Sequence, residues 1–70
     1  MISDAFDPLL LRAFVSVCQY GSLSRAAEQA GRAQSALSTQ IRRLEQLLGM
    51  RLLHRTGRGV VPTTDGELFL

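Results

Sequence analysis

The stretch Gln34–Leu48, with the sequence QSALSTQIRRLEQLL, constrains the fold of this chain more than any other. Its large apolar residues recur at intervals of four, three and four positions, which is the spacing of one stripe along an α-helix. They are Leu37, Ile41, Leu44 and Leu48. The stretch therefore predicts an amphipathic helix that must bury one side against the rest of the chain.

The other face of this predicted helix is polar, with short side chains near its start and two arginines one turn further on. Short polar groups can approach base edges closely, whereas long cationic groups reach phosphates. This face is typical of a DNA-recognition helix, with expected base contacts and expected backbone contacts. The base contacts are Gln34, Ser35, Ser38 and Thr39, and the backbone contacts are Arg42 and Arg43.

For the two arginines an alternative remains open. Either of them can instead pair with Glu45 or Gln46 on the helix surface, an interaction that contributes little stability.

The charge distribution favours a polyanionic partner more than the net charge does, because the chain carries only +2 in total. Between Arg25 and Arg58, seven arginines stand against two glutamates, a local balance of +5. Arginine binds phosphate and guanine through a planar fork, but a solvated basic surface also explains the composition.

Local signals predict two helices before this stretch. Asp7 and Pro8 suit the start of a first helix, which is expected to end at Gly21. Ser22 is expected to cap a second helix over residues 23–30. Its predicted inner face is apolar and includes a pair of alanines that would let two helices cross closely. The inner face comprises Leu23, Ala26, Ala27 and Ala30.

A short helix, a turn at Gly31 and an amphipathic helix form the helix-turn-helix pattern. Beyond Gly49, residues 52–54 and 60–61 predict two short strands, joined by a turn over residues 55–59. Such a hairpin beside a helix-turn-helix is called a wing.

Thr63 is then expected to cap a last helix that starts at Thr64. It leads into three apolar residues, Leu68, Phe69 and Leu70, which predict an interface or a helix cut short.

Length and composition bound the remaining possibilities. The 70 residues suffice for one small domain. A single cysteine, Cys18, cannot form an internal disulfide, which fits a reducing cytoplasm, and we expect it to pack in the core. The start of the chain lacks the pattern of a secretory signal, and no apolar run is long enough to span a bilayer. His54 has no partner at ligand spacing. We therefore expect no catalytic site, no metal and no cofactor.

Several short motifs occur in a fixed order along the chain. They are Leu11-Arg12-Ala13-Phe14, Gly21-Ser22-Leu23-Ser24-Arg25-Ala26-Ala27, Gln34-Ser35-Ala36-Leu37-Ser38, Gln40-Ile41, Leu44-Glu45, Leu48-Gly49, Leu52-Leu53, Arg55-Thr56-Gly57-Arg58 and Thr63-Thr64-Asp65-Gly66. In this order and spacing, the set resembles the N-terminal DNA-binding domain of LysR-type transcriptional regulators over nearly the whole chain.

The resemblance implies a mainly α fold, a winged helix-turn-helix with a three-helix core, a two-stranded wing and the start of a fourth helix. Residues 1–63 would form the DNA-binding domain and residues 64–70 the start of a linker and dimerisation helix. It implies sequence-specific binding of double-stranded DNA to regulate transcription, at the nucleoid in a bacterial cytoplasm. It also implies a homodimer and a small-molecule inducer that binds a C-terminal domain, which we expect this chain to lack.

Carried over by residue, the resemblance places Gln34, Ser35, Ser38 and Thr39 toward the major groove. It places backbone contacts on the wing and around the start of the second helix, where helix amides favour phosphate. These contacts are Ser22, Ser24, Arg55, Thr56 and Arg58. Leu68, Phe69 and Leu70 would belong to the dimer interface.

This sequence departs from the family pattern at the start of the recognition helix. Ala33 stands where the family usually has serine or threonine, and an alanine cap costs about 1 kcal/mol. Ser35 stands where proline is frequent, and Thr39 stands where arginine is frequent. The last change gives up a bidentate guanine contact of about 1–3 kcal/mol, and it bears on which bases are read.

A protein-interaction module that reuses the winged fold is the rival interpretation, with Leu68, Phe69 and Leu70 as its docking patch. Charge discriminates between the two, because an interaction module has no need for arginines gathered on the recognition helix and the wing.

Overall fold

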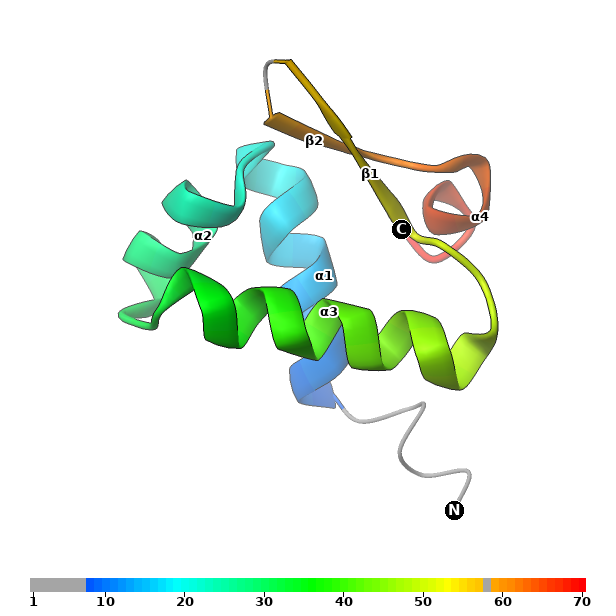
Figure 1. The fold of residues 1–70 in the computed structure, drawn as a ribbon, viewed down its shortest axis with the longest axis horizontal. Helices are drawn as coiled ribbons and strands as arrows, with labels where there is room; N and C mark the ends of the chain where they lie inside the picture. Colours follow the sequence, from blue (N-terminus) through cyan, green and yellow to red (C-terminus); the bar gives the residue numbers. More distant parts are fainter. Residues whose placement is uncertain (1–7, 58) are drawn as a thin grey trace.

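The computed structural model describes residues 8–57 and 59–70. The described elements are α1 (Pro8–Tyr20), α2 (Leu23–Ala30), α3 (Gln34–Leu48), β1 (Leu53–Thr56), β2 (Gly59–Pro62) and α4 (Thr64–Glu67). In Figure 1, α3 crosses in front of α1, α2 lies beside them, and the hairpin lies near the C-terminal end of α1. The fold is mainly α, with three packed helices and a two-stranded wing, as predicted. Asp7 and Arg58 lie outside the described residues.

The core forms where α1, α2 and α3 pack against one another in pairs. Phe14 and Val17 of α1 and Leu44 of α3 are completely buried. Ala26 and Ala27 are buried as well, which agrees with the predicted inner face of α2. Ala30 was predicted to face inward and is exposed, because it is the last residue of α2 and the chain turns away at Gly31.

Local capping accounts for the bounds of the helices. The backbone N–H of Arg25 donates to the hydroxyl of Ser22 at 3.2 Å, which caps α2 as predicted. Gly31 and Gly49 end α2 and α3 with φ values of 66° and 69°, in the left-handed region that favours glycine. Ala33 holds the extended conformation of a cap before α3, but an alanine side chain cannot accept a hydrogen bond.

The wing is an antiparallel hairpin whose register differs from the prediction. Leu53 pairs with Pro62 and Thr56 pairs with Gly59, so only residues 57–58 lie between the strands. The predicted strand over 52–54 and turn over 55–59 were therefore wrong at their ends. Gly59 pairs with Thr56 at the end of the ladder, and its φ of 140° is a conformation that glycine adopts without strain.

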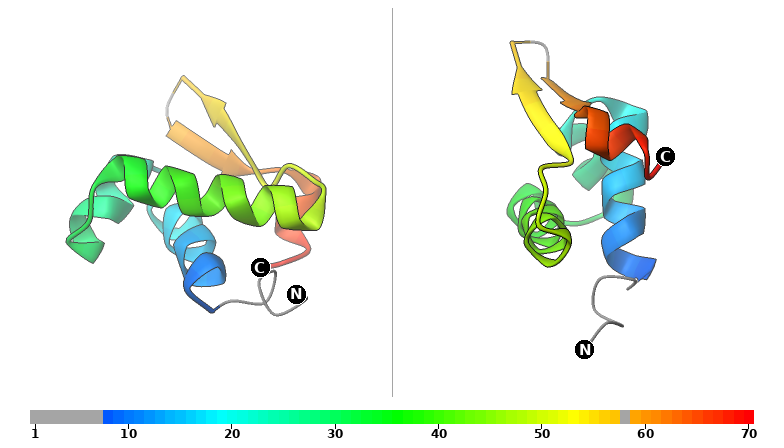
Figure 2. Two further views of the ribbon diagram at one scale, coloured as in Figure 1. Left: turned by 60° about the horizontal axis from the view of Figure 1, so that its bottom comes forward. Right: turned by 90° about the vertical axis from the view of Figure 1, so that its right-hand side faces the viewer.

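The wing attaches to the helices through β2. The N–H of Val60 donates to the carbonyl of Gly21 at 3.1 Å, at the end of α1. A Cβ at Gly59 would overlap the same carbonyl oxygen, so a side chain is excluded there. Figure 2 shows the hairpin extending beyond the helices, with α4 close to its base.

Among residues 8–57 and 59–70, no helix is long and apolar enough to cross a membrane.

Candidate nucleic-acid interface

The two faces predicted for α3 are present in the folded chain. Leu37, Ile41 and Leu44 are buried against the other helices. On the opposite side, Ser38 is half-buried and the other predicted contact residues are exposed: Gln34, Ser35, Thr39, Arg42 and Arg43. The polar face is therefore open to a partner along the first two-thirds of the helix.

Gln34 and Ser35 are exposed at the start of α3. The first N–H groups of a helix have no acceptor within the helix, and they favour anions. Beside this start, a guanidinium N–H of Arg32 donates to the amide oxygen of Gln40 at 2.9 Å. Arg32 was not among the predicted contacts. Its position in the turn just before the helix was the available signal, and its hydrogen bond holds it along α3.

A hollow of about 200 Å³ brings the starts of two helices together with the wing. Its lining includes Ser22 and Ser24 at the start of α2, Gln34 at the start of α3, and Arg55 and Thr56 of β1. These residues lie far apart in the sequence, and all five were predicted to contact DNA. Ser22 also has a structural role, since its hydroxyl caps α2 and lies 3.1 Å from the hydroxyl of Ser24.

Arg55 lies on the side of the wing that faces the helices. It pairs with Val60 across the hairpin, and paired residues of an antiparallel ladder share one face. Val60 is buried against the core, which identifies that face. Arg55 also lines a second hollow of about 140 Å³ between α3 and the wing, together with Ser38 and Arg42. The prediction placed Arg55 in the turn, whereas it lies in the strand.

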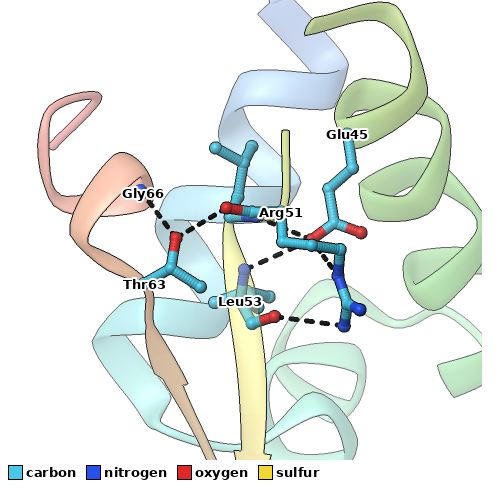
Figure 3. Close-up of polar contacts among 6 residues, drawn as sticks. Glu45, Arg51, Leu53, Thr63 and Gly66 are labelled. Carbon is cyan, nitrogen blue, oxygen red and sulfur yellow. Dashed lines mark hydrogen bonds and ion pairs between the residues drawn. The ribbon is translucent and has the colours of Figure 1, made fainter. Parts of the chain in front are cut away.

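The sequence reasoning missed the role of Glu45, which it considered only as a surface partner of Arg42 or Arg43. Its side chain is 14% exposed, and its carboxylate lies 3.5 Å from Nε of Arg51. One carboxylate oxygen also accepts hydrogen bonds from the N–H groups of Leu52 and Leu53, at 2.8 and 3.2 Å. Figure 3 shows these contacts at the base of the wing. A signal was available, because an acidic residue near a helix C-terminus is disfavoured unless it has another partner.

The predicted interface residues after α4 are exposed. Thr63 caps α4 as predicted, since its hydroxyl accepts a hydrogen bond from the N–H of Gly66 at 3.0 Å. The exposed fractions of Leu68, Phe69 and Leu70 are 80%, 40% and 61%. Their exposure is compatible with an interface, and their role in dimerisation stays a prediction.

Cys18 and His54 take no part in this surface. Cys18 is half-buried against the core, and burial raises the pKa of its thiol, which keeps the thiol protonated. His54 is exposed in β1, next to Arg55 in the strand and therefore on its opposite face. No three His, Cys, Asp or Glu residues gather as a metal site within residues 8–57 and 59–70.

Comparison with known proteins adds an independent finding. The sequence profile described as "Bacterial regulatory helix-turn-helix protein, lysR family" matches residues 9–67. The chain is 54% identical over 61 residues to the HTH-type transcriptional regulator DgdR of Burkholderia cepacia, covering 87% of this chain and 21% of DgdR. It is 55% identical over 60 residues to PgrR of Escherichia coli K12, covering 86% of this chain and 20% of PgrR. These relatives are regulators, and the chain spans about a fifth of their length.

Solved structures agree with this assignment. The BenM DNA-binding domain in complex with catB site 1 DNA is 44% identical, with a TM-score of 0.80 over 84% of this chain and 66% of that one. The LysR family transcriptional regulator CbnR is 34% identical, with a TM-score of 0.84 over 87% of this chain and 21% of that one. With the profile match and the winged helix-turn-helix described above, the chain belongs to the LysR family of bacterial regulatory helix-turn-helix proteins.

Proposed function

We propose that this chain binds double-stranded DNA sequence-selectively and that it does so to regulate transcription. One observation carries the proposal: the hollow lined by Ser22, Ser24, Gln34, Arg55 and Thr56 joins the open start of α3 to the wing. The similarity to a BenM domain solved in complex with DNA supports the same assignment.

In this proposal the start of α3 enters the major groove, which is wide enough to admit a helix. Gln34 and the hydroxyls of Ser35, Ser38 and Thr39 would read base edges, since glutamine can bind adenine through two hydrogen bonds. Long cationic side chains would reach phosphates on both sides of the groove. The proposed backbone contacts are Ser22, Ser24, Arg42, Arg43, Arg55, Thr56 and Arg58.

The proposal includes a division of the chain and a partner copy. Residues 1–63 would form the DNA-binding unit, and residues 64–70 would begin a linker helix. The exposed Leu68, Phe69 and Leu70 would be buried in a homodimer that reads two half-sites about one helical turn, or a multiple of it, apart. An inducer would act through another domain of the whole regulator. The regulator would work at the nucleoid in the cytoplasm. No cofactor or catalytic step is part of the proposal.

Selection of bound duplexes from a random library, followed by mobility shifts at several salt concentrations, tests the proposal. We expect the chain to bind a selected duplex more tightly than a scrambled duplex. Arg55→Ala should weaken binding to both duplexes and reduce the salt slope by about 1, because it removes a phosphate contact. If the folded chain shows no preference at physiological salt, the proposal is wrong.

A protein-interaction module is the second candidate, and the 80% exposure of Leu68 is the observation that favours it. The two candidates differ in what the arginines do. If Arg55→Ala and Gln34→Ala leave DNA binding unchanged while Leu68→Ser abolishes a protein complex, the interaction module is the better assignment.

A further inference from the structure

The base of the wing is tied to α3 and to α4 by polar contacts, which we call the wing joint: Glu45, residues 51–53, Thr63 and Gly66 (Figure 3). We infer that Glu45 is a positioning residue for DNA binding, which holds the wing and its Arg55 in register with the recognition helix. This inference rests on the proposed function.

The carboxylate of Glu45 binds the first residue of the wing directly. The same oxygen accepts from the N–H groups of Leu52 and Leu53, at 2.8 and 3.2 Å. Leu52 is completely buried, and Leu53 is the first residue of β1. Hydrogen bonds to an ionised acceptor are stronger than those between neutral groups. Arg55 lies two residues further along β1, on the same face as Leu53. The contact that holds the backbone of Leu53 therefore also positions the backbone from which the Arg55 side chain extends.

Arg51 closes the joint from the solvent side. Its side chain is 76% exposed, with Nε 3.5 Å from the carboxylate of Glu45. Its guanidinium also donates to the carbonyl of Leu53 at 3.4 Å. An ion pair this exposed contributes little stability by itself. It lies beside the same carboxylate oxygen that accepts from the two amides.

The start of α4 holds the same segment from the other side. The hydroxyl of Thr63 donates to the carbonyl of Arg51 at 2.6 Å, and the N–H of Thr63 donates to the carbonyl of Leu52 at 2.9 Å. The N–H of Gly66 donates to the hydroxyl of Thr63 at 3.0 Å. Residues 51–53 are therefore bound by α3 on one side and by α4 on the other.

Such a joint matters for DNA binding because a duplex sets the distance between base edges in a groove and the adjacent backbone. An isolated two-stranded hairpin is marginally stable. If the wing moves relative to α3, ordering it on DNA costs conformational entropy, and the contact of Arg55 contributes less to affinity. The carboxylate of Glu45 on α3 binds the amide of Leu53, the first residue of β1, and the amide of Leu52 just before it.

The test compares Glu45→Ala, Glu45→Gln, Arg55→Ala and the Glu45→Ala/Arg55→Ala double variant in this chain. Affinity is measured for a duplex selected by the wild type and for a scrambled duplex, at several salt concentrations. We expect Glu45→Ala to weaken binding to both duplexes by roughly tenfold. It should also reduce the salt slope toward that of Arg55→Ala. The double variant should lose little beyond Arg55→Ala, since both changes remove one contribution.

Two comparisons separate positioning from stability or charge. Glu45→Gln keeps a neutral oxygen of the same reach, so it should recover part of the affinity and part of the slow hydrogen exchange of the Leu52 and Leu53 amides. Glu28→Ala removes a glutamate that is exposed on α2, and it should bind DNA equally well or more tightly. Removing a negative charge by itself should favour binding to DNA. A loss of binding in Glu45→Ala therefore cannot come from the change in charge.

The inference is overturned if the losses from Glu45→Ala and Arg55→Ala multiply in the double variant. It is also overturned if Glu45→Ala lowers only the folded fraction and leaves the salt slope unchanged. Should Glu45→Ala not fold, Glu45→Asp takes its place in the comparison, because it keeps the charge but is one methylene too short to hold both amides in the same way. If the wild-type chain shows no duplex preference, the proposed function itself is wrong. If the wild type is selective but the two losses multiply in the double variant, only the inference about Glu45 is wrong.

Discussion

The two ends of α3 differ in how the rest of the chain holds them. At the N-terminal end, Ala33 supplies no side-chain acceptor for the free amides, and Gln34 and Ser35 are exposed. At the C-terminal end, Gly49 caps the helix, and Glu45 binds the amides of Leu52 and Leu53. The end proposed to meet DNA lacks a side-chain cap, and the end farther from it is anchored.

This difference is reasonable for a helix that must bind a partner. Unpaired donors and exposed polar side chains cost stability in the free protein, yet they are the groups that a ligand can use. The anchored end supplies stability and fixes the direction of the helix. We therefore expect substitutions at the two ends to have opposite effects on the free energy of unfolding.

The largest effect is expected in the wing joint beside the anchored end, from Gly66→Ala in α4. A Cβ at Gly66 would overlap the carbonyl oxygen of Leu52, a backbone atom that cannot move without disturbing the wing joint. We expect the free energy of unfolding to fall by about 1–3 kcal/mol, as for other overpacked sites. Thermal denaturation measures the change. Gly57→Ala is the matched control, because a Cβ there meets no atom within 4 Å. Equal losses in the two variants would contradict the prediction.

A smaller effect of opposite sign is expected at the open end, from Ala33→Ser. Ala33 already has φ −71° and ψ 143°, the extended conformation of a helix cap, so a serine hydroxyl can accept from the first turn. The free energy of unfolding should rise by about 1 kcal/mol. Urea denaturation checks this value, with Ser22→Ala as the reverse change on α2, which should lose a similar amount. An unchanged midpoint for Ala33→Ser would show that the start of α3 is already satisfied.

The smallest effect on stability is expected from Gln34→Ala, which separates binding from folding. Gln34 is exposed, so its truncation should change the free energy of unfolding by less than about 0.5 kcal/mol. The preference for the selected duplex should nevertheless decrease, by about 1–3 kcal/mol if the amide reads one base pair. Competition binding with the two duplexes measures this preference. Gln46→Ala, exposed nearer the other end of α3, is the control and should leave the preference intact.

Local sequence signals predicted the helices well because each signal acts on its own neighbours. Ser22, Gly21, Gly31 and Gly49 mark helix ends through hydrogen bonds or positive φ values within a few residues. The helix pattern also predicted both faces of α3. The wing was predicted less well, because strand pairing depends on residues that are distant in the sequence.

Gly59 and Glu45 illustrate that limit. Nothing beside Gly59 in the sequence indicates that it must fit against the carbonyl of Gly21, which sets where β2 begins. The position of Glu45 near the C-terminal end of α3 indicates that its carboxylate needs a partner, but not that the partner is two amides seven and eight residues further on. The misplaced turn and the missed glutamate share this cause.

The sequence by itself determined the three helices, most residues of their buried faces and the existence of a wing, because periodicity and capping are short-range properties. It also determined most of the candidate contact residues on α3. Only the tertiary structure decided that Arg55 lies on the helix side of the wing, beside Ser22, Ser24 and Gln34. The same holds for Glu45 as the residue that ties α3 to β1. These placements depend on packing between separate elements, which no local pattern encodes.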